Sequence, residues 1–361
     1  MQKEMISMWQ AISIIVLFLF GSTAVMGMNS GAGHDSWIAL IVASLFGGVL
    51  VLVYARLIRL LPGMDFYDMA QTVFGKIIGK IIIALMAWYA IQLSALVLRS
   101  FSEFIQIVSL METPQLVVMV TMLLVTGYMV FSGIETLAKW VMIALALTLG
   151  IVLFTMIISI RQSDFSNIFP ILEHDFSTMG KATLNLFVFP FAETVIFLTL
   201  ADSIKKSDNV YKIYLSGIFI GGVVLLMLFL RNVLILDVPM QNEIYFPSYA
   251  AARVASIGEI FARIEMSIFA NFVLGCIAKL SICILAAVKG VKKLFGIKKN
   301  GRTLFFISLL ILVVSKVQFE NVMELITFSE IYPYYAMPFQ IAIPILVWIG
   351  AEIKMRKKSR K

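Results

Sequence analysis

Ten apolar windows, each about as long as a bilayer is thick, divide this chain. Bounded by charged or turn-forming residues, they lie at about residues 9–28, 36–58, 77–98, 115–133, 139–160, 183–201, 211–235, 266–288, 303–318 and 335–353. A helix needs about 20 apolar residues to cross the hydrocarbon core, where only helices and closed barrels satisfy their own backbone. With 61% hydrophobic residues, the sequence predicts an all-α membrane protein of ten transmembrane helices in one domain, residues 1–361.

Basic residues set the expected orientation. Most of the 29 lysines and arginines fall in the two ends and the alternate loops, including a basic tail at 354–361. Four basic residues occupy the opposite loops: Arg161, Lys181, Arg253 and Arg263. Because cytoplasmic loops carry the excess of Lys and Arg, both termini are expected in the cytoplasm. The net charge of +8 then reflects topology, so a nucleic-acid partner is not expected.

The sixth window carries a proline and a carboxylate, Pro190 and Glu193, at its middle. A proline removes a helical hydrogen bond, and a charge at bilayer depth costs roughly 2.5–3.5 kcal/mol on insertion scales. Such a segment usually lines a cavity. The alternative is a proline-kinked helix whose carboxylate is satisfied by a neighbouring helix.

The first window holds Gly21, Ser22 and Thr23, followed by further glycines. These residues allow a backbone to unwind, although they also suit close helix packing. Two interrupted helices, first and sixth, would head two five-helix halves of opposite orientation, at about residues 9–160 and 183–353. This is the pattern of a 5+5 inverted-repeat transporter, whose ligand site lies at the midplane between the two breaks.

Further candidates for this site come from the third and sixth windows. Tyr89 and Gln92 share one face of the third helix, and Phe187 and Phe191 flank Pro190. Lys279 lies some 15 Å, by helical rise, from the cytoplasmic end of the eighth helix. Its ammonium is expected to pair with Glu193 or with carbonyls of the first helix, the alternative being a snorkelling side chain.

Polar residues elsewhere carry weaker signals. Arg99 and Glu103, four residues apart near the outer end of the third helix, are expected to form an interfacial ion pair. His34 and His174 stand in outer loops without metal-ligand spacing, so no metal, cofactor or enzymatic chemistry is expected. The long outer loops 161–181 and 236–265, the second with an amphipathic stretch at 249–261, are expected to form a lid or a partner surface.

Several short stretches together resemble one family. They are Gly21-Ser22-Thr23, Gly133-Ile134-Glu135-Thr136-Leu137-Ala138, Phe169-Pro170-Ile171-Leu172, Phe189-Pro190-Phe191-Ala192-Glu193, Arg263-Ile264-Glu265 and Lys279. With the ten-helix length and short basic tail, the chain resembles the B subunits of endospore germinant receptors, within the amino acid–polyamine–organocation superfamily.

That resemblance implies a sensor for a small nutrient germinant, an amino acid or sugar, acting in the spore inner membrane. It also implies assembly with a larger membrane-embedded A subunit and a lipoprotein C subunit. The same architecture serves active amino-acid permeases, so secondary transport is the alternative function.

Overall fold

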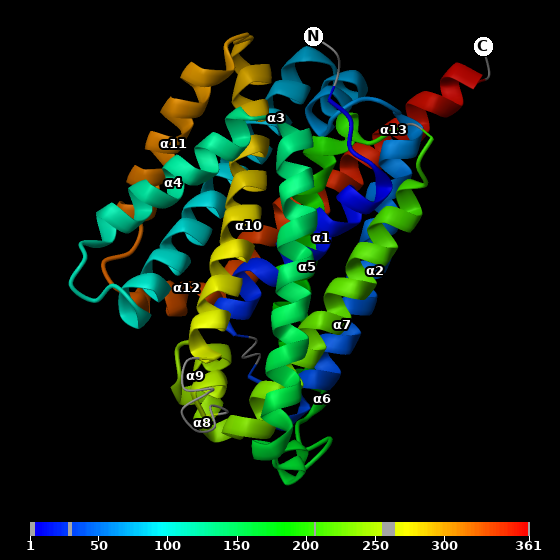
Figure 1. Cartoon of the computed structure of the whole chain (residues 1–361). Coiled ribbons are helices and arrows are strands. Elements are labelled where there is room, and N and C mark those ends of the chain that lie inside the picture. The colour runs from blue at the N-terminus through cyan, green and yellow to red at the C-terminus, as the bar shows by residue number, and fades with distance from the viewer. Residues whose placement is uncertain (1–3, 28–30, 206, 255–263, 360–361) are drawn as a thin grey trace.

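The computed structural model describes residues 4–27, 31–205, 207–254 and 264–359. These residues form a helical bundle (Figure 1). The α-helices among them are α1 (Met8–Met26), α2 (Ser36–Leu60), α3 (Phe66–Val108), α4 (Gln115–Phe131), α5 (Ile134–Ser159), α6 (Phe176–Leu186), α7 (Val210–Leu236), α8 (Val238–Glu243), α9 (Pro247–Val254), α10 (Ile264–Phe295), α11 (Asn300–Val317), α12 (Val322–Met337) and α13 (Ile343–Ser359).

Within the described residues, eight helical segments are long and apolar enough to cross a membrane. Two shorter apolar helices, Met8–Ala24 and Gln115–Phe131, occupy the first and fourth predicted windows. The all-α membrane class is therefore confirmed, and each predicted window coincides with helical structure, although two of the ten are short for a span. The start of α1 and the end of α13 lie at the same end of the bundle, opposite α8 and α9 (Figure 1).

The predicted interruption of the first helix is wrong. Helix α1 runs unbroken through Gly21, Ser22 and Thr23, and ends only at Gly27, whose φ of 77° terminates the helix. The Thr23 hydroxyl donates to the carbonyl of Leu19 in its own helix, 2.8 Å away. The small residues serve close packing instead, because a Cβ at position 21 would lie 3.1 Å from the Lys279 side chain and 3.2 Å from the Gly275 carbonyl.

The predicted interruption of the sixth helix is confirmed. Helix α6 gives way to a π-helical turn, η4 (Phe187–Phe191), and then to a 3₁₀ helix, η5 (Ala192–Ser203). The break falls at Phe189, whose φ of −125° and ψ of 110° are extended, directly before Pro190. Since proline has no N–H and disfavours helical geometry in the residue before it, the sequence itself imposes the break.

The last span also changes its helical winding. A π-helical turn, η7 (Pro338–Ala342), separates α12 from α13. Pro333 in α12 and Pro338 at the start of η7 each remove a backbone donor, which explains a locally widened helix. The sequence analysis did not anticipate this second irregular turn.

Candidate functional site

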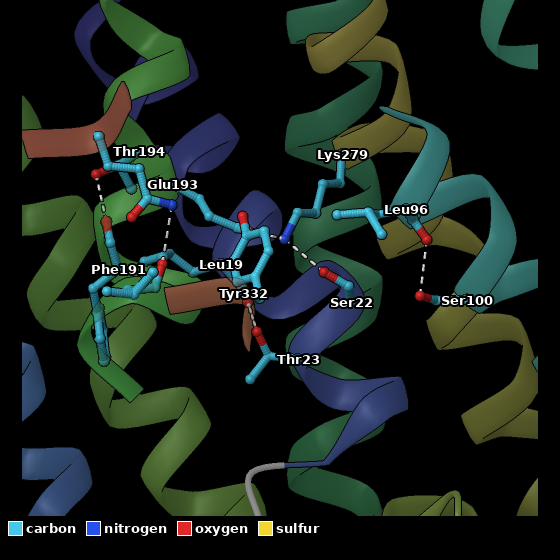
Figure 2. Close-up of polar contacts among 12 residues, drawn as sticks. Leu19, Ser22, Thr23, Leu96, Ser100, Phe191, Glu193, Thr194, Lys279 and Tyr332 are labelled. Atoms are coloured by element: carbon cyan, nitrogen blue, oxygen red, sulfur yellow. Dashed lines mark hydrogen bonds and ion pairs between the residues drawn. The ribbon is translucent and has the colours of Figure 1, made fainter. Parts of the chain in front are cut away.

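A buried ion pair lies where η5 meets α1 and α10. The Lys279 ammonium from α10 is 2.5 Å from the Glu193 carboxylate and donates to the Ser22 hydroxyl at 2.6 Å (Figure 2). The Lys279 and Glu193 side chains are 0% and 1% exposed. This pairing fulfils the expectation for Lys279 and excludes the snorkelling alternative.

Two aromatic rings also lie close to the ammonium. The Lys279 Nζ lies 4.8 Å from the ring centroid of Phe18 and 5.1 Å from that of Phe189. The negative face of an aromatic ring attracts a cation at this distance, and more strongly where water is excluded. The ammonium is therefore held by one carboxylate, one hydroxyl and two rings.

The second carboxylate oxygen of Glu193 is the first acceptor in a network of buried hydrogen bonds. The Tyr332 hydroxyl donates to Glu193 at 2.6 Å and lies 3.2 Å from the Tyr89 hydroxyl. The Gln340 amide donates to Tyr89 at 2.8 Å and to the Val188 carbonyl in the broken turn at 3.2 Å. Thus both irregular turns, η4 and η7, connect to the ion pair through side chains of α3 and α12.

Sequence reasoning missed Tyr332 and Gln340. Gln340 is fully buried, and its backbone carbonyl accepts a hydrogen bond from the Tyr54 hydroxyl of α2 at 2.5 Å. A glutamine and a tyrosine beside prolines in an apolar span were the available signal, since a polar group at bilayer depth requires a partner.

The other predicted site residues divide between two locations. Gln92 is buried on α3, three residues from Tyr89. Phe191 packs toward α2 and α7, where Cβ atoms at Gly47 and Gly222 would lie 2.9 Å and 3.7 Å from it. Phe187 makes an edge contact with Phe46 of α2, at 6.2 Å between centroids. The two phenylalanines therefore contact the α2 side of the break.

The predicted ion pair on α3 exists but is buried. Arg99 Nη2 lies 2.7 Å from Glu103, and the two side chains are 2% and 12% exposed. Gln115 of α4 donates to the same carboxylate at 2.8 Å, so a neighbouring helix covers the pair. The ion pair expected for these residues is therefore confirmed and is covered by a neighbouring helix, while its position at the outer membrane interface stays a prediction.

At the end of the bundle that holds α8 and α9, the Asp35 carboxylate binds the backbone of the segment before α6. Asp35 is fully buried and accepts from the backbone N–H groups of Leu172, Glu173 and His174 at 2.5, 2.9 and 3.1 Å. This contact holds residues 172–174 against the start of α2, and the last part of the predicted loop 161–181 belongs to α6. Within the predicted amphipathic stretch of the next loop, α9 ends at Val254 and residues 255–261 lie outside the described part of the chain.

At the opposite end, charged residues line a cavity of about 400 Å³. Its lining includes Asp65, Asp68, Asp202, Lys289, Lys292 and Lys293. Lys289 is 2.7 Å from Asp202, and Lys293 pairs with Asp68. Burial raises the pKa of the Asp65 carboxyl, and the nearby ammonium groups of Lys289 and Lys293 oppose that rise.

Comparison with known proteins gives one consistent family. Residues 5–322 match the family described as "Spore germination protein". Spore germination protein KB of Bacillus subtilis (strain 168) is 25% identical over 366 residues, covering 100% of this chain and 98% of that protein. Spore germination protein YndE of the same organism is 23% identical over 333 residues, covering 91% and 89%.

Solved transporters share the fold. Mhp1, a nucleobase-cation-symport-1 family transporter in a closed conformation with bromovinylhydantoin bound, has a TM-score of 0.70 at 12% identity, covering 95% of this chain and 78% of Mhp1. MhsT in complex with L-phenylalanine has a TM-score of 0.67 at 10% identity, covering 98% and 99%. The chain is thus a multi-pass membrane protein with a transporter fold, and likeness at these identities concerns the fold alone.

Proposed function

The chain belongs to the spore germination protein family, and from that premise we propose that it is the sensing subunit of a spore germination receptor. It binds a small nutrient germinant of the amino acid or sugar class and works without catalysis. Binding shifts the bundle between two conformations, and partner subunits read the change. A ligand drives such a shift only through its different affinity for the two states.

The observation that carries this proposal is the break in the sixth helix beside a buried ion pair. Phe189 has extended backbone dihedrals directly before Pro190 within the π-helical turn η4, and interrupted helices in membranes occur where a backbone lines a ligand site. Ser22, Tyr89, Gln92 and Glu193 would supply polar contacts to the germinant. Gly21 and Thr23 form the α1 wall, while Phe187 and Phe191 form the α2 wall.

Lys279 acts in this proposal as a fixed internal cation. Its ammonium lies 2.5 Å from the Glu193 carboxylate inside the bundle, so the two opposite charges compensate each other. A soluble cation is then unnecessary at this point between α1, η5 and α10. We therefore propose germinant binding that does not depend on sodium.

An active amino-acid permease is the second candidate, favoured by the fold shared with Mhp1 and MhsT. A permease must open its site alternately to both sides, whereas a sensor needs only to signal. Uptake of radiolabelled germinant by vesicles containing this chain without partner subunits supports the permease. Binding without uptake supports the sensor.

The proposed receptor includes a larger membrane-embedded A subunit and a lipoprotein C subunit. We place it in the spore inner membrane with both termini in the cytoplasm. If the chain depends on this assembly, deleting the A subunit lowers its abundance in spore membranes. Undiminished abundance contradicts the dependence.

A binding screen of amino acids, sugars and nucleosides against the purified complex tests the proposed function. Ser22→Ala removes the hydroxyl that accepts from Lys279, and we expect weaker binding. Ser159→Ala is the matched control, because Ser159 is buried on α5 and donates to the Thr155 carbonyl of its own helix. Equal affinities for both variants and the parent would remove Ser22 from the binding site.

A further inference from the structure

Two ion pairs join η5 to the same neighbouring helix. Near its first residues Glu193 pairs with Lys279, and near its last residues Asp202 pairs with Lys289, at 2.5 and 2.7 Å. Lys289 also donates to the Thr199 carbonyl at 3.1 Å. Both lysines come from α10, so one helix holds η5 at both ends.

The spacing of the charges matches on the two elements. Glu193 and Asp202 are nine residues apart, which spans about 18 Å in a 3₁₀ helix; Lys279 and Lys289 are ten residues apart, which spans about 15 Å in an α-helix. Two attachments so far apart restrain both sliding and tilting of η5 against α10. With only one ion pair, η5 could still rotate about that contact relative to α10.

Helix α6, the other half of the sixth span, has no ion pair to α10 among the contacts of the described residues. Helix α6 packs on α2, and the non-helical Phe189 separates it from η5. Proline at 190 supplies no backbone donor across the break. Bending of the sixth helix would therefore concentrate between Phe187 and Phe191, with η5 staying on α10.

From this geometry we propose that η5 and α10 move as one rigid body while both ion pairs are intact. We further propose that the Asp202–Lys289 pair is the one that can break, which releases that end of η5 from α10. That pair is 21% and 23% exposed and borders the cavity of about 400 Å³, whereas the Glu193–Lys279 pair is buried. A partly hydrated pair is weaker and more easily broken than a buried one. Its rupture frees the inner end of η5 and widens the cavity.

The backbone beside Asp202 bears a second restraint. The N–H of Ile6, before α1, donates to the Ser203 carbonyl at 2.8 Å. Glu4 in turn accepts from the Ile134 N–H that opens α5, and Glu135 accepts from the Met5 N–H. Release of η5 from Lys289 would thus be transmitted to the starts of α1 and α5, independently of which germinant is bound.

Cysteine labelling tests the releasable end. Ser203 is 4% exposed, so Ser203→Cys, in a chain with Cys276 and Cys283 replaced by alanine and assembled in its complex, is expected to react slowly with a membrane-impermeant maleimide. Asp202→Asn should raise the rate about two- to fivefold, the effect of losing one partly exposed ion pair. The exchanged pair Asp202→Lys with Lys289→Asp should return the rate to within twofold of the parent.

Lys293→Met is the matched control, because Lys293 lines the same cavity but pairs with Asp68 rather than with η5. Its labelling rate should equal that of the parent. An unchanged rate in Asp202→Asn, an exchanged pair as reactive as Asp202→Asn, or an equal rise in Lys293→Met would each overturn the proposal.

A distance measurement distinguishes release from misfolding. Spin labels at Lys205, beyond η5, and at Phe295, at the end of α10, should give a narrow distance distribution in the parent and in Lys293→Met. Asp202→Asn should broaden it while Glu193 stays paired. A distribution that is broad in the parent, or equally narrow in Asp202→Asn, contradicts the rigid body.

Discussion

Replacing Lys279 with methionine should destabilise this protein more than any comparable change to a peripheral charge. Methionine keeps much of the side-chain volume but removes the ammonium that lies 2.5 Å from Glu193. The carboxylate, 1% exposed, would keep only its bond from Tyr332. Removing one partner of a buried pair typically costs about 3–5 kcal/mol because the remaining charge stays desolvated.

This loss is a large part of the total free energy of unfolding of a typical protein. Native proteins are stable by about 5–15 kcal/mol, so a loss of about 3–5 kcal/mol takes roughly a fifth or more of the free energy of unfolding. Combining Lys279→Met with Glu193→Gln removes both charges and should recover most of the loss. Lys279→Arg should recover little, since a planar guanidinium does not fit the place of a compact ammonium.

Denaturant unfolding of the purified variants in detergent measures these differences as a double-mutant cycle. Glu352→Gln is the control, because the Arg56–Glu352 pair has a similar separation of 2.7 Å but side chains 42% and 21% exposed. Its expected cost is about 0–1 kcal/mol. A cost for Lys279→Met no larger than for Glu352→Gln, or a double variant no better than the single one, would refute the reasoning.

Three further outcomes follow from the same structure. Single cysteines at Ser163 and Lys299 should label from opposite sides of the membrane, and labelling from one side would contradict the ten-helix topology. Gly21→Val should abolish germinant binding because its Cβ would crowd Lys279, whereas Gly48→Val, where an added Cβ meets nothing within 4 Å, should bind normally; equal affinities would remove α1 from the site. Germinant binding should be unchanged when choline replaces sodium, and a strict sodium requirement would contradict Lys279 as the internal cation.

The ion pair could be predicted from the sequence because two opposite charges at membrane depth have few alternatives to meeting each other. The break in the sixth helix could also be predicted from the sequence, since Pro190 constrains its own backbone and that of Phe189. Local chemistry decided both features. The division into two repeats, at about 9–160 and 183–353, stays a prediction.

Features that depend on neighbours were harder to predict. Gly21, Ser22 and Thr23 suit an unwound backbone and a close helix contact equally well, and the Lys279 stem of α10 decides for close contact. Tyr332 and Gln340 reach Glu193 and Tyr89 only because α12 packs against η4 and η7 packs against η5. No spacing along the chain carries that information.

The most direct measurement for the proposed site is an equilibrium titration of the assembled receptor with the germinant found in the binding screen. The parent is compared with the variant that combines Lys279→Met and Glu193→Gln, after unfolding has shown that this variant is folded. The account predicts that the parent binds and that the neutralised variant loses binding at least tenfold. Parental affinity in the folded variant would place the germinant elsewhere and contradict the account.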